Sequence, residues 1–191
     1  NEQEAIRYYK MAIDKGNTNA MLNYGNMLFN GISTSTNTTL NIPEIDFKVT
    51  LIIPSSKNKD EVKACHYYKM AADKGNADAM DKYGDMLSYG TGVLINIIEA
   101  NRYYKMAADN GNVDSMYKLG VNLEIGFGIL INKEEAIRYY KMAADKGHLK
   151  AQKNYQRLFN QQMQIQNLID QQRIELMSID QEIRHQNLLN K

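Results

Sequence analysis

Apolar residues along most of this chain recur at the spacing of amphipathic helices. In residues 96–110 they fall at i, i+3, i+4, i+7 and i+8, on one helical face: Ala100, Tyr103, Tyr104, Ala107 and Ala108. Asn96 and Glu99 have the spacing of a capping box, and Gly111 stands where a left-handed residue often ends a helix. This pattern predicts one helix over residues 96–110, which we term helix B.

A second helical pattern follows directly, and we term it helix A. Asn112 can cap it, and its buried stripe is predicted to be Ser115, Met116, Leu119, Gly120 and Leu123. A glycine inside a helix costs about 1 kcal/mol relative to alanine. We therefore expect a bulky side chain of helix B, such as a tyrosine, to lie over Gly120. A Gly-x-Gly loop comes next, and we expect the apolar residues 129–131 after it to tuck between repeats.

The two helices repeat along the chain. The segment Tyr-Tyr-Lys-Met-Ala begins at Tyr67, Tyr103 and Tyr139, in two steps of 36 residues, and an earlier copy begins at Tyr8. Neither helix can bury its stripe alone, so neighbouring hairpins must stack. The sequence predicts an all-α solenoid in these units: helix B at 1–15, repeats at 17–74, 76–110 and 112–146, and a terminal helix A from 148.

The first repeat contains an insertion. The step from Tyr8 to Tyr67 is 59 residues rather than 36, and we place the additional residues at 32–59. The insertion begins with a Ser/Thr/Asn run, residues 33–39, that is typical of a disordered linker. Residues 42–54 are flanked by prolines and alternate as in a strand. Three interpretations are open: a mobile loop, a docking or regulatory loop, and an artefact of gene prediction.

Residues 160–191 are rich in glutamine. No Gly or Pro follows Gly147, so the terminal helix A can continue almost to the end of the chain. Residues at alternating three- and four-residue spacing form a weak coiled-coil stripe: Leu158, Gln162, Ile165, Ile169, Gln172, Leu176, Ile179, Ile183 and Gln186. Two interpretations are open. Residues 149–191 form a polar capping helix that folds over the last repeat, or a coil that binds a partner or a second copy.

The residues of one repeat resemble those of the Sel1-like repeat family, which is related to the tetratricopeptide repeat. The matching residues are Ala79, Tyr83-Gly84, Gly90-Thr91-Gly92-Val93, Glu99-Ala100, Tyr103-Tyr104, Ala107-Ala108 and Gly111. The match covers roughly residues 1–159 apart from the insertion. The resemblance implies a right-handed superhelix whose concave face docks proteins or peptides, as in adaptors and assembly factors. This chain lacks the cysteine pair that some secreted bacterial members carry in each repeat.

Candidate chemistry is sparse. Three histidines, His66, His148 and His185, lie in different contexts, and no spacing of cysteine and histidine suits zinc. Cys65 takes a slot held by Ile or Asn in the other copies, which indicates a packing role rather than a nucleophile. The loop Gly90-Thr91-Gly92 lacks the lysine of a phosphate loop. We therefore expect no enzyme activity, no metal and no cofactor.

The partner-binding surface is expected where the copies differ and side chains point outward, because residues identical in every copy are explained by packing. On three helices A these positions form one patch: Leu22, Asn26, Phe29, Asp81, Asp85, Ser88, Tyr117, Val121 and Glu124. We expect this patch on the concave face. There it would dock a peptide or helix that has apolar anchors and a basic residue opposite Asp81 and Asp85.

These observations favour a protein-interaction scaffold or adaptor. The alternative is a regulatory adaptor that activates a bound enzyme, with residues 160–191 as a second contact. With 23 basic and 22 acidic residues the net charge is +1, which opposes an RNA-binding array. No apolar run is long enough to span a bilayer, and the single cysteine favours a reducing compartment, so we expect a cytoplasmic protein. The first residue is Asn rather than Met, so we expect a fragment or processed chain whose array extends upstream.

Overall fold

The computed structural model describes residues 2–33, 37–42, 47–52, 57–58 and 60–189. Within these residues the chain forms eight helices and four short strands. The helices are α1 Glu2–Asp14, α2 Thr18–Asn30, α3 Glu61–Asp73, α4 Ala77–Tyr89, α5 Ile97–Asp109, α6 Val113–Ile125, α7 Lys133–Asp145 and α8 Leu149–Leu189.

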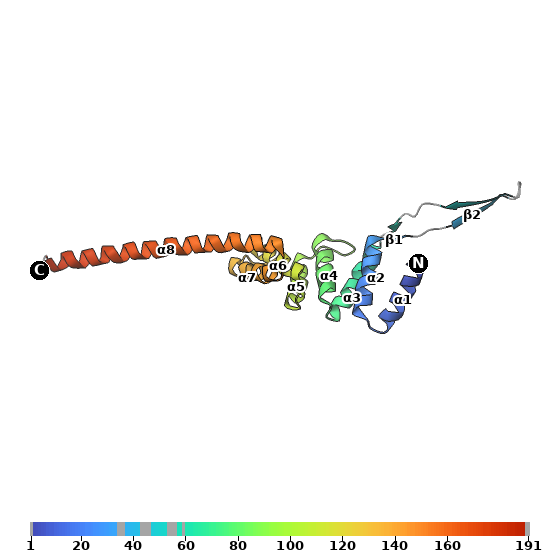
Figure 1. Ribbon diagram of the computed structural model, residues 1–191, viewed down its shortest axis with the longest axis horizontal. Coiled ribbons are helices and arrows are strands. Elements are labelled where there is room, and N and C mark those ends of the chain that lie inside the picture. The colour runs from blue at the N-terminus through green and yellow to red at the C-terminus, as the bar shows by residue number, and fades with distance from the viewer. Residues whose placement is uncertain (1, 34–36, 43–46, 53–56, 59, 190–191) are drawn as a thin grey trace.

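The helices stack in sequential pairs, which confirms the predicted all-α solenoid (Figure 1). Helices A (α2, α4 and α6) pack most extensively on the helices B that follow them (α3, α5 and α7). Each helix B then packs on the next helix A, so the buried residues form one continuous core from Met21 to Leu158. The N-terminal helix α1 is a helix B at one end of the stack, and α8 is a helix A at the other.

Asparagine caps begin the helices, as predicted. The Asn17, Asn76 and Asn112 side chains accept hydrogen bonds from the backbone N–H groups three residues on, at 2.8–2.9 Å. The predicted cap Asn1 lies outside the described residues. His148, which replaces a capping asparagine, is itself a cap: its Nδ1 accepts from the Ala151 N–H at 3.0 Å. Its ring also stacks on Tyr117, with centroids 4.5 Å apart.

A tyrosine lies over the glycine inside each helix A, as expected. A Cβ atom built on Gly84 would stand 2.7 Å from Cε1 of Tyr104, and one on Gly120 would stand 2.8 Å from Cδ1 of Tyr140. Gly25 and Tyr68 repeat the arrangement at 2.8 Å. These glycines allow helix B to approach closely. In α8 the same position is Gln156, and no packed helix B follows among the described residues.

The Gly-x-Gly loops pack against the previous repeat. Gly92 has φ +67°, and a Cβ atom there would collide with the carbonyl group of Glu61. The apolar residues after the loop differ from expectation, because only the first of each run packs on the core. Val93 and Ile129 do so, whereas Leu94 and Leu130 are both 88% exposed.

The insertion leaves and re-enters the array at the points that a short loop would use. The backbone N–H of Asp60 donates to the Leu28 carbonyl at 3.1 Å, as Asn96 does to Leu87 at 2.9 Å. Strands β1 Ile32–Ser33 and β4 Lys57–Asn58 pair next to the array, and β2 Asn37–Ile42 pairs antiparallel with β3 Phe47–Ile52 further out (Figure 1).

The strand prediction for residues 42–54 is confirmed for 47–52, whereas residues 43–46 and 53–54 lie outside the described residues. The linker prediction for residues 33–39 is wrong where β1 and β2 occupy that run. Residues 34–36 are outside the described residues. The hairpin needs both strands, and only β3 shows a strand-like alternation in its sequence.

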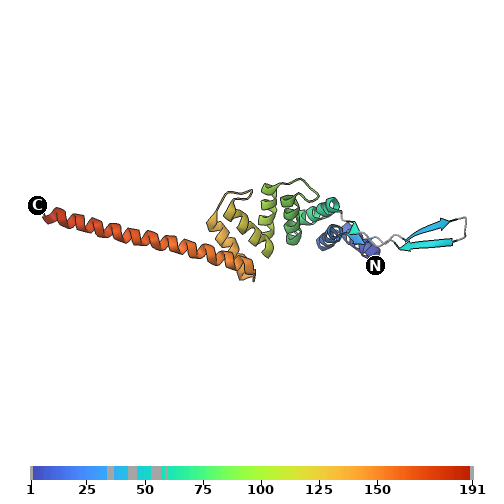
Figure 2. The ribbon, with the colours of Figure 1, turned by 90° about the horizontal axis from the view of Figure 1, so that it is seen from above.

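Helix α8 packs on the array only through its first part. Ala151 and Leu158 are buried, and every described side chain from Phe159 to Asn187 is exposed. Figures 1 and 2 show the rest of α8 extending away from the array, at the end opposite to the hairpin. A capping helix is therefore the correct interpretation only for the part before Phe159.

Candidate partner-binding face

The face formed by the helices A carries two pockets. One lies between α2 and α4 and is lined by Asn26, Phe29, Asn30, Tyr68, Lys82, Asp85 and Met86. The other lies between α4 and α6 and is lined by Ser88, Tyr89, Tyr104, Tyr117, Lys118, Val121, Asn122 and Phe127. Six of the nine predicted positions line these pockets: Asn26, Phe29, Asp85, Ser88, Tyr117 and Val121.

The two pockets occupy the same place in successive repeats. Each has a buried helix-B tyrosine at its floor, Tyr68 in the first and Tyr104 in the second. Each has a lysine two residues before the helix-A glycine, Lys82 or Lys118. The walls differ: the first combines Asn26, Asn30 and Asp85 with Phe29 and Met86, and the second combines Tyr117, Val121 and Phe127 with Ser88 and Asn122. The face thus presents similar sites with different chemistry.

The floor tyrosines are held by hydrogen bonds to helix A. The Tyr68 hydroxyl donates to Asn26 Oδ1, the Tyr104 hydroxyl to Asp85 Oδ1 and the Tyr140 hydroxyl to Glu124 Oε2, each at 2.9 Å. Asn26, Asp85 and Glu124, which were predicted to contact the partner, therefore also accept a hydrogen bond inside the array. Burial and neighbouring acids raise the pKa of Tyr104 and Tyr140, and burial, with a smaller contribution from Asp85, raises the pKa of Tyr68 to about 12.

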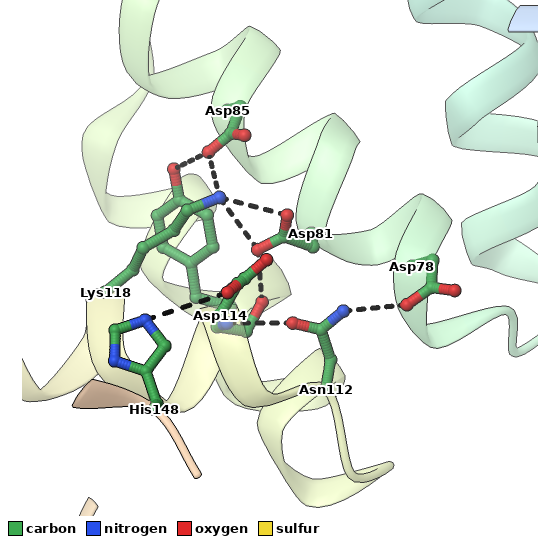
Figure 3. Close-up of polar contacts among 9 residues, drawn as sticks. Asp78, Asp81, Asp85, Asn112, Asp114, Lys118 and His148 are labelled. Atoms are coloured by element: carbon green, nitrogen blue, oxygen red, sulfur yellow. Dashed lines mark hydrogen bonds and ion pairs between the residues drawn. The ribbon is translucent and has the colours of Figure 1, made fainter. Parts of the chain in front are cut away.

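The two aspartates of the predicted patch, Asp81 and Asp85, share one lysine within the protein (Figure 3). Asp81 is only 3% exposed and accepts hydrogen bonds from Ser115 Oγ at 2.6 Å and from Lys118 Nζ at 2.9 and 3.0 Å. The same ammonium group donates to Asp85 Oδ1 at 2.6 Å. The expectation that Asp81 points outward is therefore wrong, because Asp81 faces the next helix A instead of solvent.

Lys118 is held as a cation by this arrangement. Burial alone would lower the pKa of Lys118, but the negative charges and hydrogen bonds of Asp81 and Asp85 outweigh burial and raise it. Lys82, its counterpart one repeat earlier, is exposed and has no hydrogen bond or ion pair among the described side chains. Two lysines in one structural position thus play different parts.

The remaining two predicted residues are also used by the array. Glu124 accepts two hydrogen bonds from the Arg157 guanidinium of α8, at 2.6 and 2.8 Å, in addition to that of Tyr140. Leu22 is half-buried against the core. The signal that sequence reasoning missed is the spacing of Asp81 and Lys118, which is one repeat plus one residue. That spacing places opposite charges on adjacent helices A.

A third pocket lies on the helix-B side, between α5 and α7, and was not predicted. Its lining includes Ile98, Arg102, Lys105 and Glu135. Nearby Asn101 is buried, and it donates to the Phe127 carbonyl at 2.7 Å and accepts from Asn122 at the same distance. These bonds tie the loop to the array, which explains the polar residue in a core slot.

A metal centre was not found in the part of the chain that the structure describes. No group of three His, Cys, Asp or Glu side chains could hold a metal ion among these residues. Cys65 is a buried free thiol whose pKa is raised by burial, and His66 is exposed. Among the described residues no helix is long and apolar enough to cross a membrane.

The stacked helix pairs and the glycine–tyrosine contacts define a helical-hairpin repeat protein. A model of the Sel1 repeat matches residues 1–17, 18–40, 56–76, 77–112 and 113–148, and the chain belongs to this family. The matched segments leave out residues 41–55 of the insertion and the whole of α8. No match is found among curated proteins.

Solved structures share the fold. A Sel1 repeat protein from Oxalobacter formigenes is 26% identical, with a TM-score of 0.63, over 81% of this chain and 54% of that one. The antigen c5321 of uropathogenic Escherichia coli is 23% identical, with a TM-score of 0.60, over 76% and 26% of the two chains. Cysteine rich protein B of Helicobacter pylori is 18% identical, with a TM-score of 0.53, over 78% and 90%. This chain thus spans about half of the first relative and a quarter of the second.

Proposed function

We propose that this protein is an interaction scaffold or adaptor that docks a partner peptide or helix on the face of its stacked helices A. The observation that carries the proposal is the pair of repeat-equivalent pockets between α2 and α4 and between α4 and α6. Sel1 repeat proteins are typically protein-interaction scaffolds, which supports the same function.

The spacing of the pockets constrains the partner. The two pockets lie in successive repeats, and a distance of about 8–10 Å between neighbouring helices A, as between packed helices, would place the pockets about that far apart. An extended peptide covers about 10 Å in three residues, and a helix covers about 10 Å in two turns. The partner would therefore place anchoring side chains at positions i and i+3 of an extended segment, or i and i+7 of a helix.

The wall residues constrain the anchors. Tyr117, Val121 and Phe127 favour an apolar side chain between α4 and α6. Between α2 and α4, Asn26 and the exposed cation Lys82 favour a carboxylate or amide side chain. We no longer expect the partner to place a basic residue opposite Asp81, because Lys118 already forms an ion pair with the Asp81 carboxylate.

Selection of binders from a random peptide library tests the proposal. A selected peptide should bind the full chain and lose at least roughly tenfold in affinity, about 1.4 kcal/mol, when Val121→Arg blocks the α4–α6 pocket. Met142→Arg is the matched control, since Met142 is 36% exposed on helix B and lies outside both pockets. Equal affinity for the two variants, measured by fluorescence anisotropy, would remove the binding site from this face.

A further inference from the structure

The distal part of α8 is a long helix with nothing packed against it among the described residues. Leu158 is 3% exposed against the array, whereas Ile165, Ile169, Leu176 and Ile183 are between 51% and 66% exposed. At 1.5 Å per residue the segment from Phe159 to Leu189 is roughly 45 Å long. A free helix of this kind gains little from intrinsic propensity, and a covering surface would stabilise it.

One stripe of this helix is free of charge. The positions at alternating three- and four-residue spacing, which we term the α8 seam, are Gln162, Ile165, Ile169, Gln172, Leu176, Ile179, Ile183 and Gln186. The charged residues lie beside the seam, with Arg173 and Asp180 on one flank and Glu175 and Glu182 on the other. Leu158, which ends the buried part of the helix, lies on the same line. The seam thus continues the core stripe of the array beyond its last repeat.

We propose that the α8 seam binds a second copy of this chain as a parallel, in-register coiled coil. In that arrangement each isoleucine and leucine meets its own counterpart, which is the a/d packing of coiled coils. Gln172 meets Gln172, and because a glutamine amide has both donors and an acceptor it can hydrogen-bond to its own copy. A shift by one heptad would instead place Gln172 against Ile165 or Ile179 and leave the amide unpaired.

The charged residues beside the seam disfavour this pairing only weakly. Glu175 of one copy would lie near Asp180 of the other, and like charges repel. Exposed charge pairs contribute little, however, compared with burial of large apolar side chains. Association would make the scaffold bivalent, because two helix-A faces would be carried on one coil.

Light scattering coupled to size exclusion tests the association. The full chain should elute with at least twice the mass of 21.9 kDa. The seam variant Ile169→Lys/Leu176→Lys should fall to one chain, whereas the control Ile174→Lys/Met177→Lys should keep the assembly. The control residues lie on another side of the helix and are similarly exposed, at 68% and 60% against 51% and 66%. A wild-type chain of single mass at all concentrations, or equal loss in both variants, would overturn the proposal.

A disulfide test addresses register independently of stability. Cys65, the single native cysteine, is 6% exposed and does not compete for cross-linking. Under mild oxidation the Gln162→Cys variant should form a covalent dimer, because Gln162 meets its own copy in the parallel pairing, whereas an antiparallel pairing would place it beside Ile183. Gln164→Cys, which lies off the seam, should not cross-link. No cross-link from Gln162→Cys, or equal cross-linking from both variants, would overturn the parallel pairing. Neither experiment involves the peptide site. A negative result in either one would therefore contradict the coiled coil but not the proposed docking function.

Discussion

Helices α2, α4 and α6 each have a glycine in the middle because a tyrosine ring of the following helix B lies against that position. Replacing a helical glycine by alanine usually stabilises a helix by about 1 kcal/mol. For Gly84→Ala we expect the opposite sign, because the new Cβ would stand 2.7 Å from Cε1 of the buried Tyr104. Overpacking of this kind costs about 1–3 kcal/mol. Urea denaturation of the two proteins measures the change, and a stabilised Gly84→Ala variant would contradict the assignment.

At the scale of single residues, Lys118 and Lys82 allow a matched comparison, because they hold the same position in successive repeats but only Lys118 forms an ion pair among the described residues. Lys118→Met leaves Asp81 buried without its cation. Breaking a fully buried pair costs about 3–5 kcal/mol, and the partial exposure of Lys118 lowers the expected cost to about 2–3 kcal/mol. Lys82→Met removes an exposed lysine without an ion pair and should change stability by less than about 0.5 kcal/mol. Thermal and urea unfolding of both variants make the comparison. Equal stabilities would mean that the Asp81–Lys118 contact contributes nothing.

Sequence reasoning succeeded for residues whose role is local and failed for pairs across repeats. The asparagine caps and the tyrosine over each glycine follow from spacing within one hairpin. The burial of Asp81 depends on Lys118, which belongs to the next repeat and approaches only after stacking. Positions at which the repeats carry different residues were predicted to bind the partner. At Asp81 and Glu124, however, the residue differs because it bonds to a different side chain within the array, Ser115 for Asp81 and Arg157 for Glu124.

At the scale of elements, the insertion at residues 32–59 lengthens the loop between α2 and α3 and leaves the packing of these two helices like that of the other repeats. The Leu28 carbonyl and the Asp60 N–H meet as the equivalent groups do around a short loop. Replacing residues 31–59 by a copy of residues 90–95 should therefore preserve the fold. The shorter loop should raise stability by about 1 kcal/mol, because loop-closure entropy grows slowly with length.

Differential scanning calorimetry of the shortened chain checks this expectation. A single transition at or above the wild-type temperature is predicted. A transition that is lower by several degrees would show that the hairpin stabilises the first repeat. As a control, the same segment 90–95 replaces residues 126–131, which form the equivalent turn after α6; this exchange should leave the transition unchanged.

Element boundaries were predictable where a cap or a glycine marks them. Each short helix ends within a residue or two of the position that its glycine predicts. The point at which α8 leaves the core could not be predicted, because no glycine or proline stops the helix. Among the described residues α8 packs on α7, and no later helix B packs on it. The pairing of β2 with β3 was missed because the Ser/Thr/Asn run has the composition of a linker.

At the scale of the whole molecule, the buried tyrosines Tyr68, Tyr104 and Tyr140 predict loss of stability at alkaline pH. Burial raises the pKa of Tyr68 to about 12, and the pKa values of Tyr104 and Tyr140 shift in the same direction. The unfolded chain would release these protons near pH 10. A raised folded pKa contributes stability that is complete below about pH 10 and lost as the pH rises toward about 12. The raised pKa of Lys118 acts with the same sign.

Melting temperatures between about pH 8 and pH 11.5, followed by circular dichroism, test this sign. They should be flat to about pH 10 and then fall steeply. A Tyr68→Phe variant, which has one fewer shifted group, should show a shallower fall. Melting temperatures that do not change up to about pH 11.5 would show that the tyrosines are not buried as described.

The number and order of repeats could be read directly from the 36-residue period, since each hairpin is a self-contained sequence unit. The pockets could not, because each is made by side chains of two helices A and one helix B from neighbouring repeats. Positions such as Asn26 and Val121 were identified individually, but only stacking shows that they line separate pockets.

Hydrogen exchange of the full chain, with and without a peptide selected from the library, tests the docking face most directly. Binding should slow exchange in the pocket-lining parts of α2, α4 and α6, and leave α1, α7 and the distal part of α8 unchanged. Protection confined to the helices B or to α8 would contradict the assignment of the partner site to the stacked helices A.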